Sequence, residues 1–489
     1  MQKVARRVEP PQGASAELKP LPLLIGGELE SGSSVEDVRS PYTGEIVGRA
    51  CIGSAEDVRR AIHAAAGAAR AAREMPSHAR AAVLERIRAG LLSRRDRLVE
   101  LLALEAGKPV SAGRLEVDRM LFVFDVAAEE SKRMGGELLP LDLVAAGERR
   151  WGLTRRFPIA PIAGIVPFNF PLLLTAHKLA PAIACGATIV MKPPPQDPLT
   201  SLLLAEVLAE SGYPAGGLSV VPCSVADAAP LLDDPRVRMV SFTGSARAGW
   251  AIRRQASRMK VVLELGGNAA VVVEPDADLE HVATRCALGG YAYAGQSCIS
   301  VQRILVHEDV HDEFVERFTE RVEALTAGDP LEESTDVGPL IDEGSAQRAQ
   351  TWIEEAVRDG ARLATGGQRT GTMLQPTVLL DTRPDMKVNC EEVFAPVTTV
   401  RPYARFDAAL EAVNDSPYGL QAGLFTRDIG RIWRAFEMLE VGGIVINDIP
   451  GFRVDHMPYG GVKDSGQGRE GVRYAMEEMT EIRLLTLAP

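Results

Sequence analysis

Short β-branched runs alternate with helical segments between Pro158 and Val273, and this alternation constrains the fold more than any other feature of the sequence. We expect strands at residues 162–166, 188–191, 218–221, 237–242 and 261–265. Helices are expected between them, near 172–184, 199–211, 225–232 and 247–256. This spacing is typical of a parallel, doubly wound α/β sheet. Such sheets bind ligands at the carboxyl ends of their strands, so a site is expected in the loops there.

The alternation resumes after Asn268 and indicates a second α/β unit. Its helices are expected at 279–291, 312–325, 346–359 and 408–414, and its strands at 301–306, 377–380 and 443–446. Elsewhere, helices are expected over 55–104 with a break near Pro76, a helix over 115–134, a strand-rich excursion over 135–157 and a closing strand over 481–487. A chain of 489 residues is too long for one hydrophobic core, so at least two domains are expected.

The composition argues against several classes of function. The formal charge of −12 disfavours nucleic acid as a partner, because a duplex must be met by a surplus of Lys and Arg. No apolar run is long enough to span a membrane, and the N-terminal MQKVARRVEPPQG, which we interpret as a mobile tail, lacks the continuous apolar segment of a secretory signal. The six cysteines are scattered, without CxxC pairs or histidines at ligand spacing. We therefore expect a cytoplasmic enzyme with reduced thiols and no metal site.

Three loops of the first unit carry polar residues where strands are expected to end. Asn169 lies in PFNFP, where its amide can donate to an oxyanion or can cap the helix that Pro171 begins. Lys192 ends an apolar run, where its charge can meet a phosphate or a ribose hydroxyl. Gly244 and Ser245 begin a helix whose free N–H groups and dipole suit a pyrophosphate.

Two common nucleotide motifs are missing from this region. No GxGxxG occurs, and the stretch from Gly244 to Gly249 has the glycine spacing of a P-loop but places Trp250 where the lysine belongs. Neither a standard Rossmann fingerprint nor a Walker A site is therefore supported.

Glu264 and Cys298 are the strongest candidates for catalysis. Glu264 interrupts the apolar run VVLELGG, where it can pair with a lysine, cap the next turn, or act as a general base whose proton affinity is raised by apolar surroundings. Cys298 follows an apolar helix that is expected to break at Gly295, and small and polar residues flank its thiol. A lone cysteine in such a loop can be inert, so the rest of the chain must support the nucleophile.

Seven motifs in order resemble those of the aldehyde dehydrogenase superfamily: PFNFP, MKPPPQDP, FTGS, LELGGN, GQSC, EEVFAP and MPYGGVKDSG. The resemblance covers nearly the whole chain. It implies an NAD(P)-binding domain of residues 1–135 and 158–264, a catalytic domain of 265–470, and an oligomerisation arm with the C-terminal strand, 136–157 and 471–489. It also implies a homodimer or homotetramer.

The resemblance further implies a mechanism. Cys298 would attack the aldehyde as a thiolate, Asn169 and the Cys298 N–H would hold the oxyanion, and Glu264 would activate water to hydrolyse the resulting thioester to a carboxylic acid. The cofactor-binding residues it implies are Phe168, Lys192, Gly244, Ser245, Leu265, Glu392 and Phe394.

Two departures from the family pattern concern the cofactor. Pro195 stands where NAD-preferring members usually carry a glutamate that binds the adenosine ribose, so the choice between NAD and NADP is open. Ala395 replaces the common glycine after Phe394, which removes no functional group.

The resemblance also implies that Arg119, Arg453 and Tyr459 bind the substrate, with both arginines at the entrance to the site. Two guanidinium groups at the entrance would suit a short aldehyde that carries a carboxylate, phosphate or phosphonate, and FRVDHMPYGGVKDSG most resembles members that act on lactaldehyde, phosphonoacetaldehyde or glyceraldehyde 3-phosphate. Alternatively, either arginine pairs with Asp118 or Asp455 and never meets substrate.

Two other functions stay open at this point. A coenzyme A-acylating enzyme is disfavoured because Glu264 is present to drive attack by water. A non-catalytic oligomeric protein on the same scaffold is disfavoured because Cys298, Glu264 and Asn169 are all retained.

Overall fold

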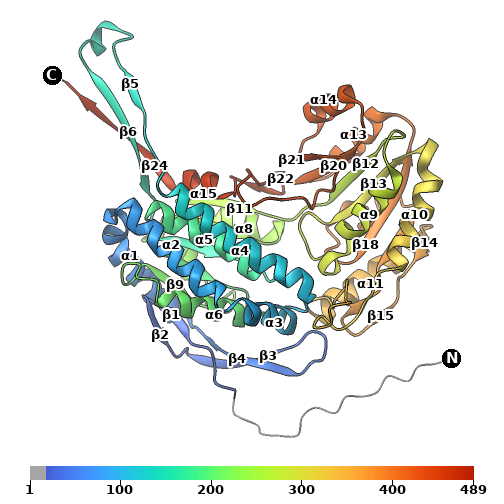
Figure 1. Cartoon of the computed structure of the whole chain (residues 1–489), viewed down its shortest axis with the longest axis horizontal. Helices are drawn as coiled ribbons and strands as arrows, with labels where there is room; N and C mark the ends of the chain where they lie inside the picture. Colours follow the sequence, from blue (N-terminus) through green and yellow to red (C-terminus); the bar gives the residue numbers. More distant parts are fainter. Residues whose placement is uncertain (1–17, 489) are drawn as a thin grey trace.

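The computed structural model describes residues 18–488, so the segment interpreted as a tail lies outside the described residues. Two α/β units lie side by side, each built on its own sheet, and a three-stranded arm projects from the first unit, away from the second (Figure 1). No described helix is long and apolar enough to cross a membrane. Within residues 18–488 no group of three or more His, Cys, Asp or Glu side chains is arranged to hold a metal, and all six cysteines are free.

The first sheet has eight strands in the order β2-β1-β9-β8-β7-β10-β11-β23. Their bounds are β1 Leu23–Ile25, β2 Glu28–Glu30, β7 Ile162–Ile165, β8 Ile189–Lys192, β9 Leu218–Val220, β10 Met239–Thr243, β11 Lys260–Glu264 and β23 Gly466–Gln467. The five strands from β9 to β11 are parallel and lie within about two residues of the predicted positions. β23 pairs antiparallel with β11, although its residues belong to the range expected for the other domain.

Alternating residues on these strands enter two separate cores, which is what a sheet covered by helices on both faces requires. Ile162 and Met239 pack in one core with α2 (Ser77–Leu92), α4 (Val110–Glu130) and α5 (Pro171–Cys185). Ala163 and Val240 pack in the other with α1 (Ala55–Glu74) and α8 (Ala246–Gln255). The predicted doubly wound α/β class is confirmed.

The remaining helices of this unit differ from prediction in their bounds. α3 is Arg95–Ala106, α6 is Pro198–Ala209 and α7 is Pro230–Asp233. The helix predicted at 225–232 is wrong in extent, because Pro230 starts a new helix and only turns precede it. The helix predicted at 115–134 begins earlier, at Val110, just after Pro109.

The second sheet has seven strands in the order β14-β17-β18-β13-β12-β20-β21. They are β12 Ala269–Val273, β13 Val301–His307, β14 Arg362–Thr365, β17 Thr377–Leu380, β18 Val397–Tyr403, β20 Gln421–Phe425 and β21 Gly443–Ile446. The helices are α9 Leu279–Tyr291, α10 His311–Glu323, α11 Glu343–Arg358, α12 Lys387–Cys390, α13 Phe406–Asn414 and α14 Ile429–Met438. The strands β12, β14, β18 and β20 and the helices α12 and α14 were not predicted.

The arm consists of β5 (Leu138–Pro140), β6 (Trp151–Pro158) and β24 (Thr480–Leu487), in the order β24-β6-β5. Its strands are antiparallel, and apolar side chains such as Trp151, Leu484 and Leu487 are more than half exposed. The short helix α15 (Val472–Glu478) leads into β24. The arm therefore presents apolar surface away from the body of the molecule.

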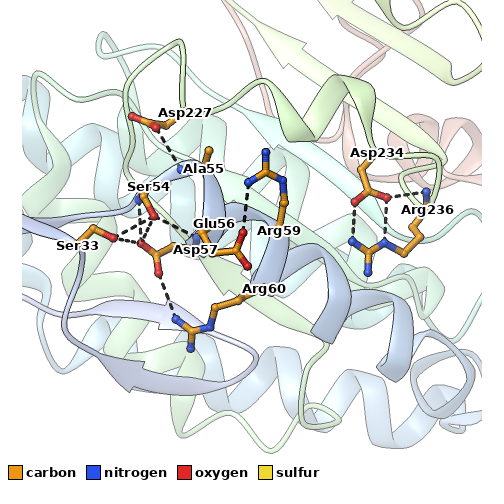
Figure 2. A network of polar contacts seen from close by, with 10 residues as sticks. All are labelled: Ser33, Ser54, Ala55, Glu56, Asp57, Arg59, Arg60, Asp227, Asp234 and Arg236. Atoms are coloured by element: carbon orange, nitrogen blue, oxygen red, sulfur yellow. Dashed lines mark hydrogen bonds and ion pairs between the residues drawn. The ribbon is translucent and has the colours of Figure 1, made fainter.

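The start of α1 is fixed by a polar network (Figure 2). Ser54 Oγ accepts a hydrogen bond from the N–H of Asp57 at 3.3 Å, and the Asp57 carboxylate accepts one from the N–H of Ser54 at 2.8 Å. The carboxylate also accepts from Ser33, in the turn that precedes the hairpin of β3 (Ser34–Arg39) and β4 (Ile46–Ile52), and from Arg60. Burial opposes the charge of Asp57, but these hydrogen bonds lower its pKa. The network ties the hairpin to the first unit.

Candidate active site

A cavity of about 390 Å³ lies between the two units. Its wall includes Thr243 and Glu264 at the carboxyl ends of β10 and β11, and Cys298 in the loop before β13. Asn169, from the loop after β7, completes the set of three catalytic candidates. These residues are far apart in the sequence and line one cavity.

An unusual loop presents Cys298. The helix α9 ends at Tyr291, and Tyr293, Ala294 and Gly295 follow with φ angles of 49°, 52° and 68°. The helix covers the predicted residues 279–291, and a short 3₁₀ segment, Ala292–Gly295, continues to Gly295, where the break was expected. Left-handed backbone at Tyr and Ala is costly and persists only where surrounding contacts hold it. Here the Tyr293 hydroxyl donates to the Ala106 carbonyl at 2.9 Å, and Gln296 Oε1 accepts from the N–H of Ile341 at 2.9 Å.

The Cys298 thiol is partly buried, and its sulfur lies 3.1 Å from the Tyr459 hydroxyl. Burial raises the pKa of the Cys298 thiol to about 12, against the hydrogen bond from Tyr459 and the charge of Arg453, which lower it. In this arrangement the thiol is protonated at neutral pH, so a nucleophilic role requires a group that accepts its proton or stabilises the thiolate.

Hydrogen bonds to its side chain and to its backbone carbonyl hold Asn169 in place. Its Nδ2 donates to the Gln296 carbonyl at 3.0 Å, and its Oδ1 is buried without a hydrogen-bond partner among the described residues. Lys108 Nζ donates to the Asn169 carbonyl at 2.7 Å and forms a fully buried ion pair with Glu116. The alternative that Asn169 caps α5 is not what the structure shows, because Glu116 accepts from the first free N–H groups of that helix, those of Leu172 and Leu173, at 3.0 and 3.2 Å.

Glu264 is 3% exposed, and neither carboxylate oxygen has a hydrogen-bond partner among the described residues. Burial and the nearby charge of Glu470 raise the pKa of Glu264 well above its usual range. The positive charges of Arg453 and Lys178 lower this pKa, but by less. The alternative of a lysine partner does not hold, because Lys178 pairs with Glu470 instead. Glu264 is thus a carboxylate with raised proton affinity that faces the cavity.

Glu470, Lys178 and Arg453 are buried charged residues near Glu264, and the sequence analysis did not predict how they pair. Glu470 accepts from Lys178 Nζ at 3.1 Å and from Arg453 Nη2 at 3.2 Å. Although burial opposes ionisation, Lys178, His177 and Arg453 hold the pKa of Glu470 at about 2. The available signal was the pair His177 and Lys178 inside the otherwise apolar helix α5, because a charge there requires a partner.

The two arginines expected to bind substrate have different surroundings. Arg119 forms a two-point ion pair with Asp455, with distances of 3.0 and 2.7 Å, and Asp455 also lies 3.0 Å from His177 Nε2. For Arg119, therefore, the alternative of pairing with Asp455 is what the structure shows, although the side chain still lines the cavity. Asp118 pairs with Arg95 instead.

Arg453 pairs with neither of those aspartates. Its guanidinium lies 3.7 Å from the centroid of the Tyr459 ring, Nη2 lies 3.1 Å from His177 Nε2, and the side chain is 6% exposed. Its Nε is buried without a partner among the described residues, and the residue lines the cavity. Arg453 is thus a buried cation with an unused donor.

The residues expected to hold a dinucleotide lie along the same cavity, with one exception. Those in its wall are Phe168, Gly244, Ser245, Leu265, Glu392 and Phe394. Ser245 caps α8, so the start of that helix opens on the cavity. Lys192 does not line this cavity; it is buried, its Nζ donates to the Pro193 carbonyl at 3.2 Å, and burial lowers its pKa.

The site fits a nicotinamide cofactor. Glu392 accepts from the N–H of Gly267 at 2.9 Å, and burial raises its pKa to about 7. Its carboxylate lies where a side chain on residue 266 would be, so Gly266 leaves room for it. Phe394 has a φ of 53° and meets Phe168 edge to face at 6.0 Å. A helix N-terminus, a carboxylate and aromatic walls together suit a pyrophosphate, a ribose and a ring.

A thiol on one α/β unit that faces a cavity shared with a second unit is an arrangement suited to oxidising a carbonyl group while it is bound to sulfur. The chain belongs to the aldehyde dehydrogenase family, whose sequence pattern matches residues 29–485. The predicted resemblance is confirmed, and the chain is an NAD(P)-dependent oxidoreductase that acts on aldehydes.

Three similar proteins illustrate the relationship. The 3-sulfolactaldehyde dehydrogenase of Priestia aryabhattai is 41% identical over 96% of this chain and 98% of its own length. Aldehyde dehydrogenase 21 from Physcomitrella patens, solved in complex with the reaction product succinate, is 41% identical with a TM-score of 0.94, over 96% of this chain and 98% of that one. Glyceraldehyde-3-phosphate dehydrogenase GapN from Methanocaldococcus jannaschii, solved with NADP, is 37% identical with a TM-score of 0.90, over 94% of this chain and 100% of that one.

Proposed function

We propose that this enzyme oxidises a small aldehyde with an anionic group to the carboxylic acid, with Cys298 as nucleophile, Asn169 as oxyanion donor and Glu264 as general base. The observation that carries the proposal is that all three residues line one cavity between the two units. Attack by the Cys298 thiolate forms a carbon–sulfur bond and leaves the negative charge on the former carbonyl oxygen.

The Asn169 amide can hold that oxygen without leaving its place. Nδ2 carries two hydrogens, and the Gln296 carbonyl takes one of them at 3.0 Å, so the second is available to the oxyanion. When bound, the nicotinamide ring would accept the two electrons and the hydrogen that leave the substrate carbon.

Glu264 then serves the hydrolytic half of the reaction. It takes a proton from a water molecule that attacks the thioester carbon, and the sulfur leaves to regenerate Cys298. Its raised pKa makes Glu264 a stronger base than an exposed carboxylate.

The cofactor is held by residues of both units. The helix start at Gly244 and Ser245 receives the pyrophosphate, and Glu392 accepts hydrogen bonds from the nicotinamide ribose. Pro195 is exposed and carries no carboxylate to repel a 2′-phosphate, so we expect NADP+ to be accepted as well as NAD+. Rates measured with both cofactors side by side test this expectation.

An anionic substrate group is favoured by Arg453, because this residue carries a positive charge and lines the cavity. The relatives agree, since 3-sulfolactaldehyde and succinate both carry an anionic group apart from the reacting carbon. Tyr459 and Arg119 complete this end of the cavity.

The domain division predicted from the sequence is part of the same proposal. The unit of the first sheet binds NAD(P), and the unit of the second carries the nucleophile. The exposed apolar strands of the arm make the contacts of a homodimer or homotetramer, which sedimentation analysis of the wild type would test.

Product analysis and two variants test the mechanism. We expect free acid to form without coenzyme A; a strict need for coenzyme A would reject hydrolysis.

Cys298→Ala should abolish turnover, and activity close to wild type would remove the nucleophile assignment. Glu264→Gln should keep a rapid burst of reduced cofactor and then turn over slowly, whereas an unchanged steady rate would show that another base activates the water.

A further inference from the structure

The hydroxyl of Tyr459 lies 3.1 Å from the Cys298 sulfur. Tyr459 is 4% exposed, and within residues 18–488 this sulfur is the hydroxyl's only hydrogen-bond partner. A buried phenol must direct its hydrogen at an acceptor, and the sulfur is the acceptor within reach. Either atom can donate while the thiol keeps its proton, but the hydroxyl is the donor once the sulfur is a thiolate.

Two features hold the ring in this position. The backbones of Tyr459 and Glu470 exchange hydrogen bonds of 3.0 and 2.6 Å, and the ring packs with Ile299 and Leu420. On the ring lies the Arg453 guanidinium, 3.7 Å from the centroid. A cation over the ring withdraws electron density and makes the phenol a better donor.

We propose that Tyr459 is a catalytic residue that donates a hydrogen bond to the thiolate of Cys298 and so increases the ionised fraction of the nucleophile. The proposal rests on the proposed function, in which Cys298 attacks the aldehyde. No proton is transferred: it stays on the Tyr459 oxygen, and the bond weakens as charge moves from sulfur to the substrate oxygen. The sequence analysis predicted that Tyr459 binds the substrate, whereas in the structure its hydroxyl contacts the nucleophile Cys298.

The size of the effect follows from two opposing trends. A hydrogen bond to a charged group changes an ionisation equilibrium about tenfold or more. A thiolate of lower proton affinity is also a weaker nucleophile, by about threefold for a tenfold change in acidity. The net advantage at pH values below the thiol pKa is thus roughly threefold.

The test uses iodoacetamide as the probe and needs no turnover. The alkylation rate of the Cys298 peptide is followed by mass spectrometry from pH 6 to 9 in the full-length enzyme. We expect Tyr459→Phe, which keeps the ring under Arg453, to react about threefold more slowly than wild type throughout. The matched control Tyr213→Phe removes another buried hydroxyl, one that donates to the Ala187 carbonyl, and should react like wild type.

A second variant separates donation from packing. Replacing Tyr459 by 3-fluorotyrosine makes the phenol a stronger donor with almost the same shape, so alkylation should become faster than in wild type. Equal rates in wild type, Tyr459→Phe and the fluorinated enzyme would overturn the proposal. If Cys298→Ala loses turnover while these rates stay equal, only the role of Tyr459 fails; if Cys298→Ala keeps turnover, the proposed function fails first.

Discussion

Replacing Arg453 by Leu should reduce activity toward anionic aldehydes much more than toward neutral ones. The side chain is 6% exposed, and Nη2 is already engaged by Glu470 and His177. Arg453 lines the cavity, so a substrate anion can gain at least one charge-assisted hydrogen bond from its guanidinium. Such a bond contributes about 2 kcal/mol, which corresponds to roughly 30-fold in kcat/KM.

The variant also disturbs the site in a way that does not depend on the substrate. Without Arg453, Glu470 keeps only Lys178 at hydrogen-bond distance, and the Tyr459 ring loses its cation. This loss lowers the rate for every aldehyde, so it cancels in the ratio of kcat/KM for two substrates. The ratio therefore isolates recognition of the anion.

The assay compares succinic semialdehyde with butanal, an uncharged aldehyde of the same chain length. We expect the preference for the anionic substrate to fall roughly 30-fold in Arg453→Leu and less in Arg453→Lys, which keeps a charge but not the planar fork. Arg119→Leu is the matched control, because that guanidinium is already paired with Asp455. A ratio that changes less than threefold in Arg453→Leu, or equally in both leucine variants, would refute the reasoning.

Two further predictions concern residues away from the reacting atoms. Lys108→Met should lower the free energy of unfolding by about 3–5 kcal/mol in denaturant titrations, because it leaves the Glu116 carboxylate buried without its cation; a loss below about 1 kcal/mol would contradict this account. Gly266→Ala should weaken NADPH binding about tenfold in fluorescence titrations, because its methyl group displaces the Glu392 carboxylate. Unchanged affinity would show that Glu392 has room to move.

Much of the fold could be predicted, because burial on both faces leaves a plain signal. β7, β8 and β17 are short runs of mostly apolar residues, and the helix α5 between β7 and β8 is buried along its whole length. β18 and β20 were missed because Pro402 and Gly423 interrupt their apolar runs. β12 was missed because it follows β11 closely in the sequence. Only Gly266, Gly267 and a few other residues separate the two apolar strands, so they were interpreted as one stretch.

The site residues that could be predicted are polar residues in otherwise apolar sequence. Glu264 stands in an apolar strand and Asn169 stands between two phenylalanines, so each could be singled out from local sequence alone. Contacts between distant residues left no such signal. Arg119 meets Asp455 across 336 positions, and Lys178 meets Glu470 across 292, so only the folded chain shows which charges are neutralised.

The balance of these charges decides which cation is left for a substrate. Arg119 and Asp455 form a neutral pair, whereas Lys178 and Arg453 share the single carboxylate of Glu470 and leave one positive charge beside Glu264. A bound anion would compete with the Glu264 carboxylate for that charge and raise its pKa further. The acid limb of thioester hydrolysis should therefore lie at higher pH with succinic semialdehyde than with butanal, since Glu264 must lose its proton before it can act. Coincident pH profiles for the two aldehydes would show that the substrate anion lies elsewhere.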